Sequence, residues 1–106
     1  MKIITCLIVD DEPNAVQLLE DYIQKIPYLS LKQKCYDAFD AVQYMEKEKV
    51  DLVFLDINMP KMSGMELAAL LPKGQCIIFT SAYASFALEG YEYNALDYIL
   101  KPIIFK

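Results

Sequence analysis

Carboxylates, a hydroxyl and a lysine stand directly after the apolar runs of this 106-residue chain. In chain order they are Asp10, Asp11, Asp56, Thr80 and Lys101. Several carboxylates in a chain without histidine are typical of a hard-oxygen site, which suits Mg²⁺ or Mn²⁺. A lysine ammonium and a threonine hydroxyl can hold the oxygens of a phosphoryl group. A carboxylate flanked by both can act as the nucleophile toward phosphorus, so the set predicts phosphoryl transfer to an aspartate.

These side chains need a scaffold that brings them to one place, and the apolar periodicity predicts one. We expect strands at residues 3–9, 29–36, 50–55 and 76–79 and within 93–100, and helices at 13–26, 37–49, 63–71 and 84–91. Asp37 is the expected N-cap of the second helix, and Ser63 with Glu66 has the pattern of a capping box. The near-continuous apolar run 50–55 is typical of a parallel strand buried on both faces. Alternating strands and helices predict an open parallel sheet, in which ligands bind beyond the carboxyl ends of the strands.

Composition and charge limit the classes of function. The residues are 56 % hydrophobic, which predicts one domain with a well-buried core. The net charge of −5 gives this chain no electrostatic reason to bind nucleic acid by itself. Its apolar runs fall far short of the ~20 residues of a membrane span, so we expect a cytoplasmic protein without membrane contact. The cysteines lie in apolar runs without metal-ligand spacing, and we expect buried core residues at Cys6, Cys35 and Cys76.

Several motifs together resemble the receiver domain of a bacterial two-component response regulator. They are Asp10-Asp11, Asp56-Ile57-Asn58-Met59-Pro60, Ser63-Gly64-Met65-Glu66, Thr80-Ser81-Ala82 and Lys101-Pro102. The resemblance spans Ile3 to Pro102, with each motif in the family's order. It implies a flavodoxin-like (CheY-like) three-layer sandwich with a five-stranded parallel sheet of strand order 2-1-3-4-5. Residues 1–106 would then form one receiver domain.

The same resemblance implies a role for each site residue. Asp56 would be the phosphoacceptor and would take the phosphoryl group from a sensor histidine kinase. The implied ligands of Mg²⁺ are Asp10, Asp11, Asp56 and the backbone carbonyl of Asn58. Thr80 would hydrogen-bond the phosphoryl group, and Lys101 would form an ion pair with it. The domain would not be an enzyme for an external substrate, since its only reactions are Mg²⁺-dependent phosphorylation and dephosphorylation at Asp56.

Other positions are implied to tune or transmit the response. Asn58, Ser81 and Ala82 occupy positions that affect access to the acceptor and dephosphorylation. Tyr98 would change rotamer as Thr80 moves toward the phosphoryl group, although an aromatic in a strand can equally be a fixed core residue. The peptide bond before Pro102 is implied to be cis. A partner protein or a second receiver, in a homodimer, would read the changed surface.

The segment 79–98 resembles one subfamily of receiver domains in particular. Its motifs, such as Asn94-Ala95-Leu96-Asp97-Tyr98, are similar to those of receivers that precede LytTR-type DNA-binding domains (LytR/AgrA-like regulators). DNA would then be bound only through a C-terminal output domain that is absent from this chain, and the output would be transcription. The alternative reading of the same aromatic residues is that they are ordinary core and half-exposed side chains.

The end of the chain departs from the family pattern. Receiver domains continue after Lys-Pro with a fifth amphipathic helix, whereas this chain stops at residues 103–106. We therefore interpret it as a piece of a longer regulator that lacks most of that helix. We expect the sheet face left uncovered to self-associate or to take up a helix from a neighbour.

Three alternatives compete with the phosphoacceptor. The first is a receiver-like module that binds proteins without taking phosphate, but this chain retains every residue that such modules lose. The second is a phosphatase of the haloacid dehalogenase type, which needs an acid two residues after its nucleophile, where Asn58 stands. The third is an FMN-binding flavodoxin, whose phosphate loop is incompatible with the acidic segment 10–12.

Overall fold

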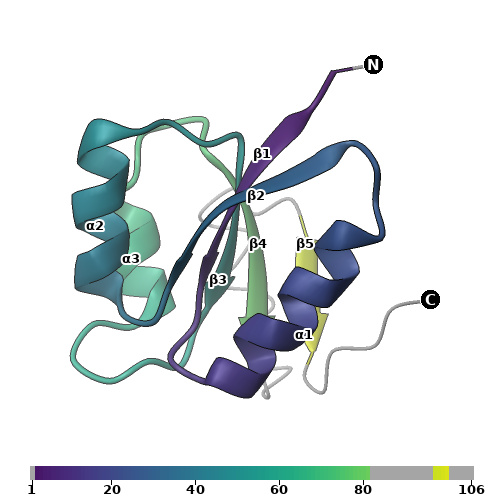
Figure 1. Cartoon of the computed structure of the whole chain (residues 1–106). Coiled ribbons are helices and arrows are strands. Elements are labelled where there is room, and N and C mark those ends of the chain that lie inside the picture. Colours follow the sequence, from purple (N-terminus) through teal and green to yellow (C-terminus); the bar gives the residue numbers. More distant parts are fainter. Residues whose placement is uncertain (1, 82–96, 101–106) are drawn as a thin grey trace.

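Parallel strands form one sheet with the order β2-β1-β3-β4-β5 (Figure 1). A computed structural model describes residues 2–81 and 97–100 of the chain. The elements are β1 (Ile4–Val9), α1 (Pro13–Gln24), β2 (Leu29–Cys35), α2 (Ala38–Lys47), β3 (Leu52–Asp56), α3 (Gly64–Leu70), β4 (Cys76–Ser81) and β5 (Asp97–Leu100). The flavodoxin-like parallel sheet and its strand order agree with the expectation. The predicted helix at 84–91 and the predicted start of a fifth helix at 103–106 lie outside the described residues.

The described helices cover the two faces of the sheet, with α1 on one face and α2 and α3 on the other (Figure 1). The central strand β3 contributes to both cores. Val53 and Leu55 pack beneath α2 and α3, whereas Leu52 and Phe54 pack beneath α1. All of these side chains are buried. The apolar run of β3 is therefore continuous because a parallel strand buried on both faces has no solvent-facing position.

Side-chain caps fix the starts of α2 and α3. The carboxylate of Asp37 accepts a hydrogen bond from the backbone N–H of Asp40 at 2.8 Å. Ser63 and Glu66 form a complete capping box, in which the Ser63 hydroxyl accepts from Glu66 N and the Glu66 carboxylate accepts from Ser63 N. Each cap satisfies a backbone donor that the helix itself leaves unpaired. Both predicted caps are confirmed, and the second sets where α3 begins next to the end of β3.

Hydrogen bonds at the opposite end of the sheet join β1 to the segment that enters β3. The Asp51 carboxylate accepts from the backbone N–H of Thr5 at 2.9 Å and from its hydroxyl at 3.0 Å. These hydrogen bonds lower the pKa of the Asp51 carboxyl. Asp51 N in turn donates to the Thr5 hydroxyl at 2.9 Å. This reciprocal contact helps to fix the register of β1 against β3.

Several element boundaries differ from the expected ones by one or two residues. α1 ends at Gln24, before the predicted stop at Pro27, because the following backbone turns through i→i−3 hydrogen bonds. β4 extends through Thr80 and Ser81, which we had placed after the strand. The reason is that the pairing of β4 with β3 continues to the last residue of β3, where Thr80 pairs with Asp56.

No helix in the described part of the chain is long and apolar enough to cross a membrane. The longest of them, α1, has 12 residues.

The cysteines do not share one environment. Cys6 and Cys35 are buried in the two cores, as predicted. The prediction for Cys76 is wrong, because its side chain is exposed. Cys76 is the first residue of β4 and lines a hollow at the amino-terminal end of the sheet.

Alkylation should distinguish these thiols. At about pH 8, iodoacetamide should modify Cys76 in the folded protein and leave Cys6 and Cys35 unmodified, because only the thiolate reacts. Burial raises the pKa of both core thiols to about 11, so they are protonated as well as inaccessible. Peptide mapping by mass spectrometry measures the modification, with the unfolded protein and Cys76→Ser as controls. Modification of a core thiol at the rate of Cys76 would contradict the described packing.

Candidate functional site

The register of three neighbouring strands brings the predicted site residues together. Val9 of β1 pairs with Leu55 of β3, so the next residues, Asp10 and Asp56, lie side by side. Asp56 in turn pairs with Thr80 of β4, and Ile57 N donates to Thr80 O at 3.0 Å. The carboxyl ends of β1, β3 and β4 therefore present two carboxylates and a hydroxyl at one edge of the sheet, as the sequence predicts.

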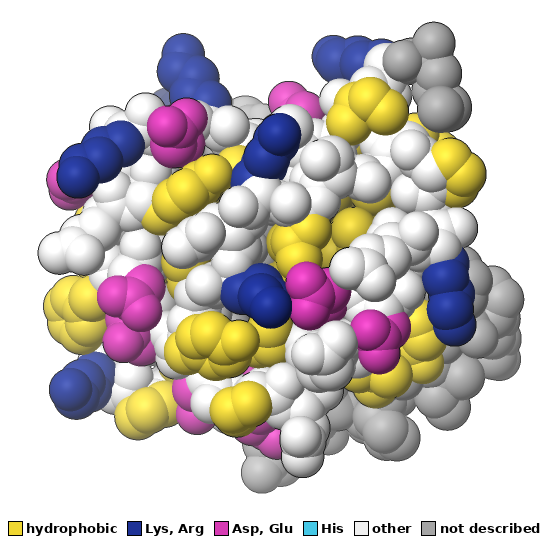
Figure 2. Space-filling view, viewed as in Figure 1, with side chains coloured by type: hydrophobic (Ala, Val, Ile, Leu, Met, Phe, Trp, Pro, Cys, Tyr) yellow, Lys and Arg dark blue, Asp and Glu magenta, His cyan; other side chains and the backbone are white. Residues whose placement is uncertain are grey.

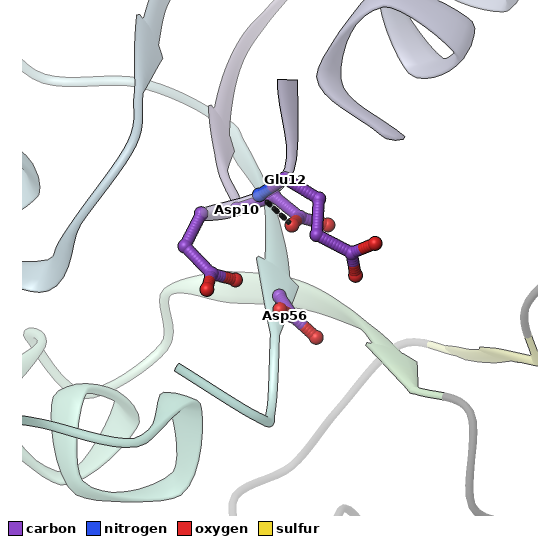
Figure 3. Close-up of side chains that lie close together, drawn as sticks. Asp10, Glu12 and Asp56 are labelled. Carbon is purple, nitrogen blue, oxygen red and sulfur yellow. Dashed lines mark hydrogen bonds between the residues drawn. The ribbon is translucent and has the colours of Figure 1, made fainter. Parts of the chain in front are cut away.

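Four carboxylates converge at this edge. Each of Asp10, Asp11, Glu12 and Asp56 offers one oxygen, and these oxygens all lie within 4.8 Å of one another. Figure 3 shows Asp10, Glu12 and Asp56 close together, with the backbone N–H of Glu12 donating to the Asp10 carboxylate at 2.9 Å. Asp10 is 0 % exposed and Asp56 is 1 % exposed. The cluster thus holds like charges largely away from water.

The donor set fits a hard divalent cation. Like charges at this spacing repel one another, and burial weakens the screening by water, so the cluster favours a bound cation. An oxygen of Asp11 is buried and makes no hydrogen bond within the part of the chain that the structure describes. All donors are carboxylate oxygens. Mg²⁺ and Mn²⁺ prefer such oxygen ligands, whereas softer metals prefer nitrogen or sulfur ligands. Asp10, Asp11 and Asp56 of the predicted ligand set are therefore brought together.

Glu12 was missing from the predicted ligand set. The reason is that the resemblance carries the pair Asp10-Asp11 and no further residue. The structure places an oxygen of the exposed Glu12 side chain in the same cluster. The available signal was the run of acids itself, which brings a third carboxylate to the turn between β1 and α1.

Thr80 and Asn58 lie on either side of the acceptor position. Thr80 is 0 % exposed, and its hydroxyl oxygen makes no hydrogen bond among the described residues. The backbone N–H of Asn58 donates to one oxygen of Asp56 at 3.3 Å. The Asn58 side chain accepts a hydrogen bond from the hydroxyl of Ser81 at 3.2 Å. The acceptor carboxylate is thus oriented by the loop that follows β3.

Other predicted residues are described in part or not at all. Tyr98 belongs to β5, where its backbone pairs with Phe79, but its side chain lies outside the described residues. Its role as a switch stays a prediction. Ala82, Lys101 and Pro102 also lie outside the described residues. Leu100, the residue before Lys101, pairs with Ser81, next to Thr80.

The loop from β3 to α3 is held close to the acceptor. Gly64 N donates to Ile57 O at 2.8 Å. A Cβ at Gly64 would lie 2.8 Å from the Cα of Ile57 and closer still to the backbone carbonyl oxygen of Asp56. Lys61 has a φ of 70°, a left-handed conformation that costs energy for a residue with a side chain. The loop therefore needs a glycine at 64 and bears local strain at 61.

Two other features of the described surface lie outside the carboxylate cluster: a hollow and a face of mixed charge. A hollow at the amino-terminal ends of the strands is lined by residues that include Lys49, Asp51 and Gln75, and by none of the predicted site residues that the structure describes. On the face shown in Figure 2, lysines and acidic side chains are interspersed. That face is therefore of mixed charge and is not a basic surface.

A family model for the response regulator receiver domain matches residues 6–106. The chain belongs to this family, the receiver domains of two-component response regulators.

Relatives and a solved structure agree with this family. The chain is 46 % identical over 105 residues to an uncharacterized response regulatory protein of Shewanella oneidensis, covering 94 % of this chain and 43 % of that protein. It is 37 % identical over 102 residues to the transcriptional regulatory protein BtsR of Escherichia coli K12, with the same coverage of 94 % and 43 %. The chain thus spans less than half of the length of these curated relatives.

The solved structure is that of the response regulator TrrA from Thermotoga maritima, determined in complex with Mg²⁺ and BeF. It superposes with a TM-score of 0.83 at 31 % identity, covering 100 % of this chain and 91 % of that one.

Substitution of Gly64 by alanine should disturb the acceptor through packing alone. The added methyl group would meet the backbone of Asp56 and Ile57, so we expect the free energy of unfolding to fall by about 1–3 kcal/mol. Urea denaturation followed by circular dichroism measures the loss. The backbone NMR signals of residues 56 and 57 should move in the same variant.

Gly74→Ala is the matched control for this substitution. Its Cβ would meet nothing within 4 Å, and its φ of 85° carries a strain that is remote from the site. The control should therefore lose some stability without shifting the signals of Asp56. Equal shifts in both variants would show that the close approach of Gly64 does not orient the acceptor.

Proposed function

We propose that this receiver domain accepts a phosphoryl group on Asp56 while Mg²⁺ is bound by Asp10, Asp11, Asp56 and the backbone carbonyl of Asn58. The observation that carries this proposal is the buried carboxylate of Asp56, which lies inside a cluster of four carboxylates at a strand end whose backbone pairs with Thr80. A bound cation would neutralise the charge that the phosphoryl oxygens bring to the carboxylates.

The residues of the chain each contribute to the transfer. The Asp56 carboxylate attacks phosphorus, a new O–P bond forms, and the P–N bond to the imidazole of a phosphohistidine donor breaks with its electron pair on the nitrogen. The backbone N–H of Asn58 orients the Asp56 carboxylate. The Thr80 hydroxyl, without a hydrogen-bond partner among the described residues, is available to a phosphoryl oxygen. Lys101 is proposed to pair with the same group.

Partners and output follow from the resemblance and from the relatives. The proposed donor is a sensor histidine kinase, and a second receiver is a proposed partner after phosphorylation. Since a relative is a transcriptional regulatory protein more than twice as long as this chain, we propose that an output domain of the LytTR type binds DNA in the complete regulator. The receiver would control that output and would convert no external substrate. A cytoplasmic location stays a prediction.

Phosphorylation is tested by the intact mass of the protein. After incubation with acetyl phosphate and Mg²⁺, the chain should gain the mass of one phosphoryl group. Omission of Mg²⁺ or the substitution Asp56→Asn should abolish the gain. Asp21→Asn, at an exposed position of α1, is the control and should be phosphorylated like the parent. A folded parent protein that gains no mass would instead favour a module that binds proteins without taking phosphate.

Cation binding is tested separately from phosphorylation. Mg²⁺ at 100 times its Kd should stabilise the folded domain by about 2.7 kcal/mol, measured as a rise in the thermal midpoint. Asp11→Asn should weaken Mg²⁺ binding by about tenfold or more, because it removes a charged ligand. The same variant without Mg²⁺ should be at least as stable as the parent, because one of four like charges is gone.

Asp21→Asn is the matched control for cation binding, since Asp21 lies exposed on α1. Its Mg²⁺ affinity should equal that of the parent. If Asp11→Asn and Asp21→Asn responded to Mg²⁺ alike, the cluster would not be the binding site.

A further inference from the structure

A hollow of about 630 Å³ opens at the amino-terminal ends of β1, β3 and β4, at the edge of the sheet opposite the arrowheads in Figure 1. The first residue of each of these strands lines it, namely Ile4, Leu52 and Cys76. The connections 48–51 and 72–75 supply most of the other walls. Small-molecule sites in proteins commonly have volumes of about 300–1,000 Å³. This amino-terminal hollow is therefore large enough for a small organic molecule.

Hydrogen bonds hold the walls of the hollow together. The side-chain nitrogen of Gln75 lies 3.3 Å from the carbonyl oxygen of Val50 and 3.3 Å from that of Asp51, so it links the two connections. The Asp51 carboxylate accepts from the backbone N–H and the hydroxyl of Thr5, which links the same wall to β1. Gln75 N donates to Pro72 O at 3.1 Å and closes the turn before β4. The hollow is thus preformed, and a ligand would not have to order its walls.

Apolar side chains form the floor of the amino-terminal hollow, and lysines stand at its rim. Most of the lining surface is apolar, and it includes Ile4, Met45, Val50 and Leu52, of which Val50 and Leu52 are buried. The lysines are all exposed: Lys2, Lys49 and Lys73. None of these lysines forms an ion pair with another described residue.

The balance of charge around the hollow is opposite in sign to that of the chain. Three lysines line the hollow with two acids, Glu48 and Asp51, whereas the whole chain carries a net charge of −5. The Asp51 carboxylate is engaged by its hydrogen bonds from Thr5. Three ammonium groups then remain against one further carboxylate, which favours a ligand with a negative group over a neutral or positive one.

We propose that the amino-terminal hollow is a binding site for a small amphiphilic anion, a molecule with an aromatic or aliphatic body and one carboxylate, sulfonate or phosphate group. The apolar body would cover the floor, and the anionic group would pair with the lysines at the rim. A lysine side chain can serve both parts, because its methylene groups contact apolar surface while its ammonium group pairs with the anion. The site is separate from the phosphoacceptor, and the proposal does not depend on phosphorylation.

Neither half of such a ligand would suffice alone. An inorganic anion has no apolar part and would leave the floor of the hollow in contact with water. Its pairing with exposed lysines would also be weak, because water screens such pairs. A neutral hydrocarbon would cover the floor but would gain nothing from the ammonium groups. Selectivity for a molecule with both parts is therefore the property to measure.

A pair of matched probes measures this selectivity. The first, 8-anilinonaphthalene-1-sulfonate, joins aromatic rings to one sulfonate and fluoresces when its rings leave water. Its Kd for the folded protein should be about 10–100 μM, as expected for a ligand of this size. The second, N-phenyl-1-naphthylamine, has the same rings without the sulfonate and should bind about tenfold more weakly. Equal affinities would show that the lysines do not recognise the anion and would overturn the proposal.

Lysine variants test the rim of the hollow. Lys49→Gln and Lys73→Gln should each weaken binding of the sulfonate probe by about threefold, and the double variant should weaken it by about tenfold. Lys32→Gln is the matched control, since it removes the same charge from an exposed position of β2 that does not line the hollow. It should bind the probe like the parent. Equal weakening in Lys32→Gln and Lys49→Gln would trace the effect to net charge and would overturn the proposal.

The thiol of Cys76 reports whether the probe occupies the hollow, because Cys76 is exposed and lines it. At 10 times its Kd, the sulfonate probe should fill about 90 % of the sites and slow alkylation of Cys76 by iodoacetamide by about fivefold or more. The same concentration should not slow alkylation of free glutathione, which controls for an effect on the reagent. Probe fluorescence without protection of Cys76 would place the probe elsewhere and would refute the assignment of the site.

Discussion

The carboxylates meet because β1, β3 and β4 run parallel in one fixed register. A shift of one residue between β1 and β3 would exchange Val9 and Asp10 between core and edge, and would turn each side chain of the strand to the other face. The alternation of Val53 and Leu55 with Leu52 and Phe54 between two cores makes such a shift costly. Hydrogen bonds between Thr5 and Asp51 at the far end of the strands favour the same register. Apolar packing thus specifies where the charges lie.

Repulsion among the carboxylates at this edge of the sheet lowers the stability of the folded state. Four carboxylate oxygens within 4.8 Å of one another raise the energy of the folded state relative to an unfolded chain, in which they would separate. The structure tolerates this cost because the cores on both faces of the sheet hold the strand ends in place. The proposed cation would remove part of this cost and would prepare the site for a further anion. Stability and function are therefore linked through one charge balance.

Much of the fold and of the site could be predicted from local patterns. The caps at Asp37 and Ser63 and the doubly buried strand before Asp56 depend on residue type and spacing, whereas the strand order was implied by the resemblance to receiver domains. The predictions that failed depend on three-dimensional position. Cys76 has apolar neighbours in the sequence like a core residue, but it stands at the start of its strand and is exposed.

Contacts between distant residues were harder still to anticipate. The hydrogen bond between Ser81 and Asn58 joins the last residue of β4 to the loop after β3. The two residues are far apart in sequence, and no periodicity marks such a pair. Glu12 enters the carboxylate cluster because of the turn after β1, whose geometry the three-acid run does not specify. The resemblance to receivers supplied roles for Tyr98 and Lys101, whose side chains are not described, so these roles stay predictions.

The position of β3 in the middle of the sheet has a consequence for motion. Its backbone amides are bonded to strands on both sides, and its side chains are enclosed by both cores, so β3 should be among the last segments to exchange hydrogen with solvent. Asp56 is the last residue of this enclosed strand. A charge added there cannot be accommodated by displacement of its own strand. The response must instead fall on the flanking loops, which makes β3 the fixed reference against which any rearrangement occurs.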